Sequence, residues 1–90
     1  MPQRLAWTRR GWEDYIFWQE HDKKMCKKIN KLIKDIFRHP FQGEGKPEPL
    51  SYQFSGSWSR RIDGEHRLVY SFDDQTSTVT VSQCRFHYQE

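Results

Sequence analysis

A single glutamate, Glu48, stands between two prolines in the segment Gly45-Lys46-Pro47-Glu48-Pro49-Leu50. Each proline fixes its own φ angle and restricts the residue before it, so the carboxylate is carried on a stiffened stretch of backbone. A positioned carboxylate beside a lysine is what a general base requires. An exposed acid on an ordinary turn is the alternative, and the segment by itself leaves both open.

Three arginines, Arg60, Arg61 and Arg67, flank the dipeptide Asp63-Gly64. Asp-Gly favours a tight turn, so the runs on either side are predicted to pair as antiparallel strands. With a two-residue turn, Arg60 lies opposite Arg67. Like charges across a ladder are unfavourable unless solvent or an anion covers them, so a polyanion is one candidate partner. Otherwise the arginines point into water or pair with acidic residues of the turn.

The segment Arg85-Phe86-His87-Tyr88 combines a guanidinium, an imidazole and two aromatic rings. An imidazole with a reference pKa of about 6.5 exchanges protons near neutral pH, and aromatic rings stack on bases. The alternative is that these residues simply lie on the protein surface and have no function. Cys84 and His87 have the spacing of a metal-binding pair, but no second pair stands at a matching distance. The sequence therefore predicts no metal site and no cofactor.

Size and composition restrict the protein that carries these groups. Ninety residues are predicted to form one domain, residues 1–90. The net charge of +3 suits a phosphate-rich partner without establishing one. There is no signal-peptide h-region and no apolar run of about 18 residues, so a cytoplasmic protein with no membrane contact is expected. Cys26 and Cys84 are expected to be reduced thiols.

Two helices are predicted in the first half of the chain. An apolar run at residues 5–7 reads as a strand, and Thr8 can cap a helix over residues 9–20. Asp22 can cap a second helix that ends before Pro40. In this helix apolar residues recur at helical spacing and lysines fill the other positions. The lysine face is either solvated or in contact with RNA. The first helix is aromatic nearly all round, which predicts contact with a second surface, such as another subunit of a homodimer.

The second half of the chain is predicted to form a β-sheet. Residues 41–50 contain two glycines and two prolines and are predicted to form a loop. Its Gly43-x-Gly45-Lys46 lacks the full phosphate-loop pattern and precedes no helix, so ATP is not expected. Residues 52–54 are expected to add a short strand, and residues 79–86 alternate as a final strand. The predicted fold is α+β, a small antiparallel β-sheet with the N-terminal helical hairpin packed on one face.

Nearly the whole chain resembles the YoeB (Txe) branch of the RelE/ParE superfamily of toxins. The matching segments stand in one order: Trp12-Glu13-Asp14-Tyr15, Lys27-Lys28-Ile29-Asn30, Gly45-Lys46-Pro47-Glu48-Pro49-Leu50, Ser55-Gly56, Trp58-Ser59-Arg60-Arg61-Ile62, Glu65-His66-Arg67-Leu68-Val69-Tyr70 and Cys84-Arg85-x-His87-Tyr88. The resemblance implies a RelE-like fold and a ribosome-dependent endoribonuclease that cuts mRNA in the A site of the 30S subunit. Its implied partners are the ribosome and its rRNA, mRNA, a YefM-like antitoxin and, together with that antitoxin, operator DNA.

The resemblance also implies the roles of individual residues. The catalytic set is expected to be Glu48, Arg67, His87 and Tyr88, and the RNA-binding set is expected to be Lys46, Arg60, Arg61, Arg85 and Phe86. Two departures stand out. Ser51 replaces a basic residue that close relatives often carry. Gln89 and Glu90 follow the usual terminal tyrosine and are expected either to shield His87 or to be disordered.

The chemistry can also be argued from RNA itself. Its 2′-OH is a nucleophile if a base removes the proton, an acid protonates the leaving 5′-oxygen and a cation stabilises the phosphorane. Glu48, His87 and Arg67 suit these roles in turn, and no metal is required. The alternative is a non-catalytic module of the same fold that binds a protein, as ParE toxins do, or RNA.

Overall fold

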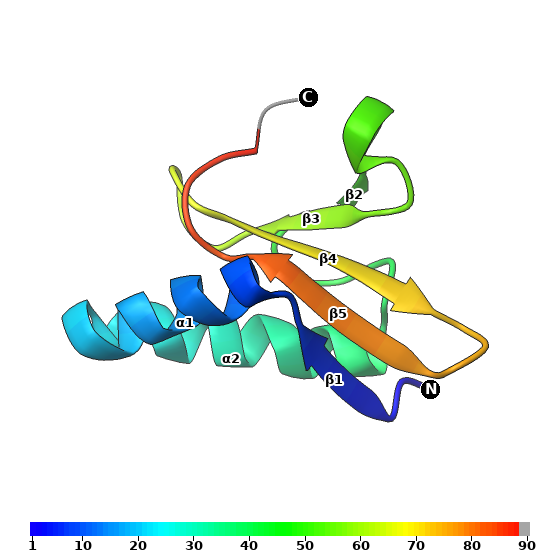
Figure 1. Ribbon diagram of the computed structural model, residues 1–90, viewed down its shortest axis with the longest axis horizontal. Coiled ribbons are helices and arrows are strands. Elements are labelled where there is room, and N and C mark those ends of the chain that lie inside the picture. Colours follow the sequence, from blue (N-terminus) through cyan, green and yellow to red (C-terminus); the bar gives the residue numbers. More distant parts are fainter. Residues whose placement is uncertain (89–90) are drawn as a thin grey trace.

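The computed structural model describes residues 1–88; Gln89 and Glu90, and the expectations placed on them, lie outside the described residues. Two helices, α1 (Arg9–His21) and α2 (Lys23–Arg38), cover one face of a five-stranded sheet (Figure 1). The strands lie in the order β1 (Arg4–Trp7), β5 (Thr78–Gln83), β4 (Arg67–Asp73), β3 (Trp58–Arg61) and β2 (Glu48–Pro49). The α+β class and the helical hairpin on one face are confirmed. Within residues 1–88, neither helix has the length and apolar character needed to cross a bilayer.

One strand pair differs from the predicted antiparallel sheet, because β1 runs parallel to β5. The reason lies in Thr8, which joins β1 to α1. Its backbone N–H donates to the carbonyl of Val81 at 2.9 Å, and its hydroxyl donates to the carbonyl of Ser82 at 3.1 Å. The start of α1 is thereby attached to the end of β5, so β1 must run toward that same end. The sheet is therefore mixed, with three antiparallel pairs and one parallel pair.

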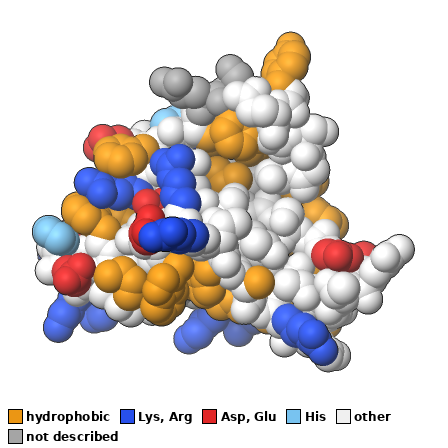
Figure 2. All heavy atoms as spheres, in the orientation of Figure 1, with side chains coloured by type: hydrophobic (Ala, Val, Ile, Leu, Met, Phe, Trp, Pro, Cys, Tyr) orange, Lys and Arg blue, Asp and Glu red, His pale blue; other side chains and the backbone are white. Residues whose placement is uncertain are grey.

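Both helix caps predicted from the sequence are present. The Thr8 hydroxyl accepts a hydrogen bond from the backbone N–H of Gly11 at 3.1 Å, and the Asp22 carboxylate accepts one from Lys24 at 3.0 Å. The apolar stripe of α2 packs on the sheet, and its buried residues are Met25, Cys26, Ile29, Leu32 and Ile36. The lysines of α2 are exposed on the other side. Figure 2 shows basic side chains projecting from the lower edge of the molecule, where α2 lies in Figure 1.

The aromatic residues of α1 pack mainly against other residues of the same chain. Trp18 is buried in the core, and Tyr15 packs against Trp7 of β1 with ring centroids 5.0 Å apart. Phe17 lies under the guanidinium of Arg85, whose Cζ is 3.5 Å from the ring centroid. Among the described residues of this aromatic group, only Trp12 is about half exposed. Most of the expected second surface is therefore β1 and the C-terminal segment of the same chain.

The register of the β3–β4 hairpin differs from the two-residue turn expected from Asp63-Gly64. Arg61, not Arg60, lies opposite Arg67, and Arg60 lies opposite Leu68. The Asp63 carboxylate accepts hydrogen bonds from the backbone N–H groups of Glu65 and His66, at 2.9 and 2.7 Å, which makes the turn longer. Because strand side chains alternate between faces, this one-residue difference turns Arg60 toward the helices.

Three local expectations also change. Glu48 is not in a loop but in β2, where it pairs with Ser59, and the missing N–H of Pro49 is tolerated because β2 is an edge strand. Residues 52–54 form a 3₁₀ turn, η1 (Tyr52–Phe54), in which Tyr52 has a positive φ of 55° that no strand accepts. The last strand ends at Gln83, so Arg85 and Phe86 do not extend it.

Candidate active site

The alternation of side chains along the strands places three of the predicted site residues on one face of the sheet. Arg60 contacts Asp35 of α2, so its neighbours Ser59 and Arg61 face away from the helices. Ser59 pairs with Glu48 on β2, and Arg61 pairs with Arg67 on β4, and paired residues share a face. Glu48, Arg61 and Arg67 therefore lie on the face that the helices leave uncovered.

Glu48 is held by the C-terminal segment on this uncovered face. The hydroxyl of Tyr88 donates a hydrogen bond to Glu48 Oε1 at 2.9 Å, and the hydroxyl of Ser59 donates to Tyr88 Oη at 3.5 Å. The ring of Phe54 meets Tyr88 edge-on at 5.9 Å. Because β3 and β4 separate β2 from β5, the segment that follows β5 must cross the uncovered face to reach Glu48 (Figure 1).

Arg67 lies at the start of β4, where the same segment passes. Its backbone N–H donates to the carbonyl of Phe86 at 3.0 Å. Its Nη1 donates to the carbonyls of Asp63 and His66, at 2.8 and 3.1 Å, so the buried guanidinium is held against the hairpin turn. With strands about 4.8 Å apart and residues about 3.3 Å apart, the Cα atoms of Glu48 and Arg67 are separated by roughly 12 Å.

His87 comes between the two residues that make these contacts, Phe86 and Tyr88. Its Nδ1 donates to the carbonyl of Tyr88 at 2.8 Å, because a carbonyl oxygen can only accept. This contact assigns a proton to Nδ1. The imidazole packs on the Tyr88 ring at 4.6 Å and is exposed. The segment thus brings His87 to the same region of the sheet as Glu48 and Arg67.

Helix α1 fixes the beginning of this C-terminal segment. The buried carboxylate of Asp14 accepts the backbone N–H of Cys84 at 3.0 Å, and Trp18 Nε1 donates to the Cys84 carbonyl at 2.9 Å. Burial raises the pKa of Asp14, while the hydrogen bond from Cys84 and the charge of Arg10 oppose that shift. Sequence reasoning missed these contacts, since they join residues about 70 positions apart and leave no local signal.

Arg60 does not belong to the uncovered face, and the structure does not support it as an RNA contact. Its side chain is completely buried, and its five N–H groups are all used within the protein. Its partners are the carboxylate of Asp35, the hydroxyl of Tyr70 and the carbonyls of His39, Gln42 and Glu44. Arg60 therefore organises the loop that leads into Glu48.

The other predicted RNA-binding residues differ in accessibility. Lys46, with a positive φ of 52°, and Arg61 are exposed beside Glu48 and Arg67 respectively. Phe86 is half exposed on the C-terminal segment. Arg85 is partly buried between the rings of Phe17 and Phe86, with its Cζ 3.5 and 4.5 Å from their centroids. Arg85 thus serves first to attach this segment to α1.

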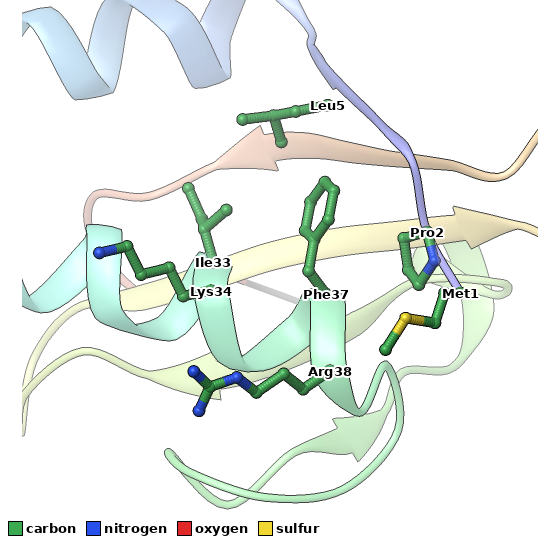
Figure 3. A pocket seen from close by; sticks show the side chains of 7 residues that line it. All are labelled: Met1, Pro2, Leu5, Ile33, Lys34, Phe37 and Arg38. Carbon is green, nitrogen blue, oxygen red and sulfur yellow. The ribbon is translucent and has the colours of Figure 1, made fainter.

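An apolar hollow lies elsewhere on the molecule. It has a volume of about 470 Å³ and lies between the N-terminal arm and the end of α2 (Figure 3). Its lining consists of Met1, Pro2, Leu5, Ile33, Lys34, Phe37 and Arg38. It contains no carboxylate or imidazole, so it offers no acid or base. Over residues 1–88, no three side chains of His, Cys, Asp or Glu converge as metal ligands would.

Comparison with known proteins assigns the family. The model of the family described as "YoeB-like toxin of bacterial type II toxin-antitoxin system" matches residues 7–88. The chain belongs to the YoeB-like toxin family. The YoeB toxin of Escherichia coli is 54% identical over 85 residues, which cover 94% of this chain and 99% of that protein.

Solved structures of YoeB toxins have the same fold. The YoeB/ParE toxin from Agrobacterium tumefaciens superposes with a TM-score of 0.93 at 51% identity, covering 96% of this chain and all of that one. YoeB from Staphylococcus aureus has been solved in a heterotetrameric complex with YefM, at a TM-score of 0.86 and 43% identity, and as a dimer, at 0.88 and 42%. Both cover 98% of this chain and all of the other. The chain is therefore a YoeB-like toxin of a bacterial type II toxin–antitoxin system.

Proposed function

We propose that this YoeB-like toxin is an endoribonuclease that inhibits translation by cutting mRNA in the ribosomal A site. The observation that carries the proposal is the uncovered face of the sheet. Glu48 and Arg67 lie on it, and the segment containing His87 crosses between them, with Tyr88 2.9 Å from the Glu48 carboxylate. A base, a cation and an acid can therefore reach one nucleotide.

Each group has a defined task in the proposed reaction. Glu48 removes the proton of the 2′-OH, which attacks the adjacent phosphorus, and the guanidinium of Arg67 stabilises the charge of the phosphorane. His87, whose Nδ1 proton is held by the Tyr88 carbonyl, donates a proton from Nε2 to the leaving 5′-oxygen. The Tyr88 hydroxyl orients the Glu48 carboxylate. The products are a 2′,3′-cyclic phosphate, or its opened form, and a 5′-hydroxyl, and no metal takes part.

The proposed contacts to RNA on this face are of two kinds, cations for phosphates and aromatic rings for bases. Lys46 and Arg61, both exposed, supply cations for the phosphates that flank the cut. The half-exposed ring of Phe86 and the ring of Tyr88 offer surfaces on which bases stack. Ser51 supplies a hydroxyl, not a charge, at the start of η1, and Lys46 then provides the basic contact near Glu48.

The partners are proposed from the relatives. The Staphylococcus aureus toxin forms a complex with YefM and also a dimer, and by analogy this chain binds a YefM-like antitoxin and forms a homodimer. Together with that antitoxin it binds operator DNA as a co-repressor, and it acts in the cytoplasm on the ribosome. Light scattering at low micromolar concentration tests the dimer, since a strictly monomeric protein would contradict it.

Primer extension on translating ribosomes tests the activity. The toxin is first treated with EDTA to remove bound metal and is then added to ribosomes kept intact by Mg²⁺. This toxin should create new mRNA ends within the A-site codon. A Glu48→Gln variant, which keeps the size of the side chain, should produce these ends about 10²–10⁴-fold more slowly. Translation arrest by the wild-type toxin without new ends would identify a non-catalytic RNA-binding or ParE-like module of the same fold.

A further inference from the structure

Phe86, the residue before His87, is held at both of its backbone polar groups by two consecutive residues. Its N–H donates to Nδ1 of His66 at 2.7 Å, and its carbonyl accepts from the N–H of Arg67 at 3.0 Å. Phe86 also has a φ of +66°, in the left-handed region that a residue with a side chain rarely adopts. The two hydrogen bonds must therefore stabilise a backbone conformation that is unfavourable for Phe86.

His66 is itself fixed by its surroundings. Its side chain is only 12% exposed, and its ring meets Trp18 of α1 edge-on with centroids 4.9 Å apart. Because Nδ1 accepts a backbone N–H, it carries no proton. In the neutral ring the proton is on Nε2, which lies 3.7 Å from the Glu65 carboxylate. The imidazole is thus an oriented acceptor, supported from the helix layer and from the turn.

We propose that His66 is a positioning residue of the active site, whose Nδ1 anchors the C-terminal segment so that His87 and Tyr88 meet Glu48 and Arg67. The proposal rests on the proposed nuclease function for its effect on rate, but the anchor itself does not. Other anchors hold the segment at Cys84, before it crosses the face. The Phe86–His66 bond is the side-chain contact that holds the residue just before the proposed acid, and it joins that residue to the neighbour of Arg67.

The size of the effect follows from geometry. Loss of the Nδ1 acceptor leaves Phe86 with one hydrogen bond in an unfavourable conformation, so the segment relaxes and His87 moves relative to the phosphate. A displacement of about 1 Å in a reacting group can reduce the rate by about 100-fold. Binding of the ribosome, which does not require the proton donor to be aligned, should change little. The expected signature is a fall in kcat with KM nearly unchanged.

Two substitutions at one position separate the acceptor from the packing. In His66→Asn the side-chain amide oxygen can occupy the place of Nδ1, whereas His66→Leu is apolar. His39→Leu, at an exposed histidine just after α2, is the matched control. On programmed ribosomes we expect His66→Leu to lose about 100-fold in kcat, and His66→Asn and His39→Leu to stay within about threefold of the wild type. Equal activity of His66→Leu and wild type, or equal loss in both His66 variants, would overturn the proposal.

NMR tests the anchor without any activity. In ¹⁵N-labelled wild-type protein, a coupling across the hydrogen bond between the Phe86 amide nitrogen and His66 Nδ1 should be observed. Exchange of the Phe86 amide proton should accelerate at least tenfold in His66→Leu but not in His66→Asn. A folded wild-type protein without the coupling would refute the anchor even if it cleaves mRNA. Coupling in a protein that cleaves nothing would instead refute the nuclease function and leave the anchor in place.

Discussion

Replacing Arg60 by leucine should destabilise the whole domain, because this arginine is a structural residue. The guanidinium is completely buried and donates to Asp35, to Tyr70 and to three carbonyls of the loop that follows α2. Leucine offers no donor. The substitution therefore leaves the Asp35 carboxylate without its cation and removes the contacts that hold the loop before Glu48.

The magnitude follows from the burial of the pair. Removing one partner of a buried ion pair typically costs about 3–5 kcal/mol, since the remaining charge is left uncompensated. Asp35 keeps a hydrogen bond from the Glu44 N–H at 2.9 Å, and its side chain is 17% exposed, so water relieves part of the loss. The lower end of the range, about 3 kcal/mol, is expected. For a domain of this size, that corresponds to a fall in Tm of roughly 12–24 °C.

The pH dependence of the loss provides a second check. The pKa of Asp35 lies below its usual value, through the hydrogen bond from Glu44 and then through Arg60, while burial opposes both. A carboxyl whose pKa is lower in the folded state stabilises the fold above its unfolded pKa of about 3.9. That stabilisation is lost as the pH falls through the folded value. The difference between wild type and Arg60→Leu should therefore shrink in acid.

Thermal unfolding followed by circular dichroism measures both effects, with Arg61→Leu as the control. Arg61 is the next residue on β3 and is exposed, so its replacement should change the stability by less than about 0.5 kcal/mol. The reasoning would be refuted if Arg60→Leu melted within about 3 °C of the wild type and lost affinity for RNA instead. Arg60 would then be a surface contact, and the buried arrangement would be wrong.

Three further predictions concern single side chains. Glu48→Gln and His87→Ala should each reduce the single-turnover rate of mRNA cleavage by about 10²–10⁴-fold, because each removes a proton-transfer group, and near-normal rates with both would remove the proposed acid and base. Tyr88→Phe should have a smaller effect, about tenfold, since it removes only the hydrogen bond from the hydroxyl that orients Glu48. A loss as large as that of Glu48→Gln would give Tyr88 a direct part in the chemistry. The thiols of Cys26 and Cys84 should react with a disulfide reagent only on unfolding, because both are buried and burial raises the pKa of each; fast reaction of both in the native protein would contradict their burial.

The local features of this protein can be predicted from the order of its residues. Thr8 and Asp22 cap the helices as their residue types predict, the apolar spacing of α2 identifies its buried stripe, and the alternation over Thr78–Gln83 identifies β5. The caps are hydrogen bonds within one helical turn, and the other two features follow from the spacing of apolar residues along a helix or a strand, so all of them can be inferred from residue order. Glu48, Arg67 and His87 are predicted as base, cation and acid from their residue types, and the resemblance to the toxin family implies Tyr88 as well.

Which of these side chains come into contact depends on the packing of the folded chain. A longer turn at Asp63 shifted the β3–β4 pairing by one residue, and that single step moved Arg60 from the predicted RNA surface into the interior. The same holds for the contact between His66 and Phe86 and for the position of Tyr88 on Glu48, which join residues 20 and 40 positions apart. Contacts at such separations depend on strand register and on how the layers pack, and no short stretch of sequence contains that information.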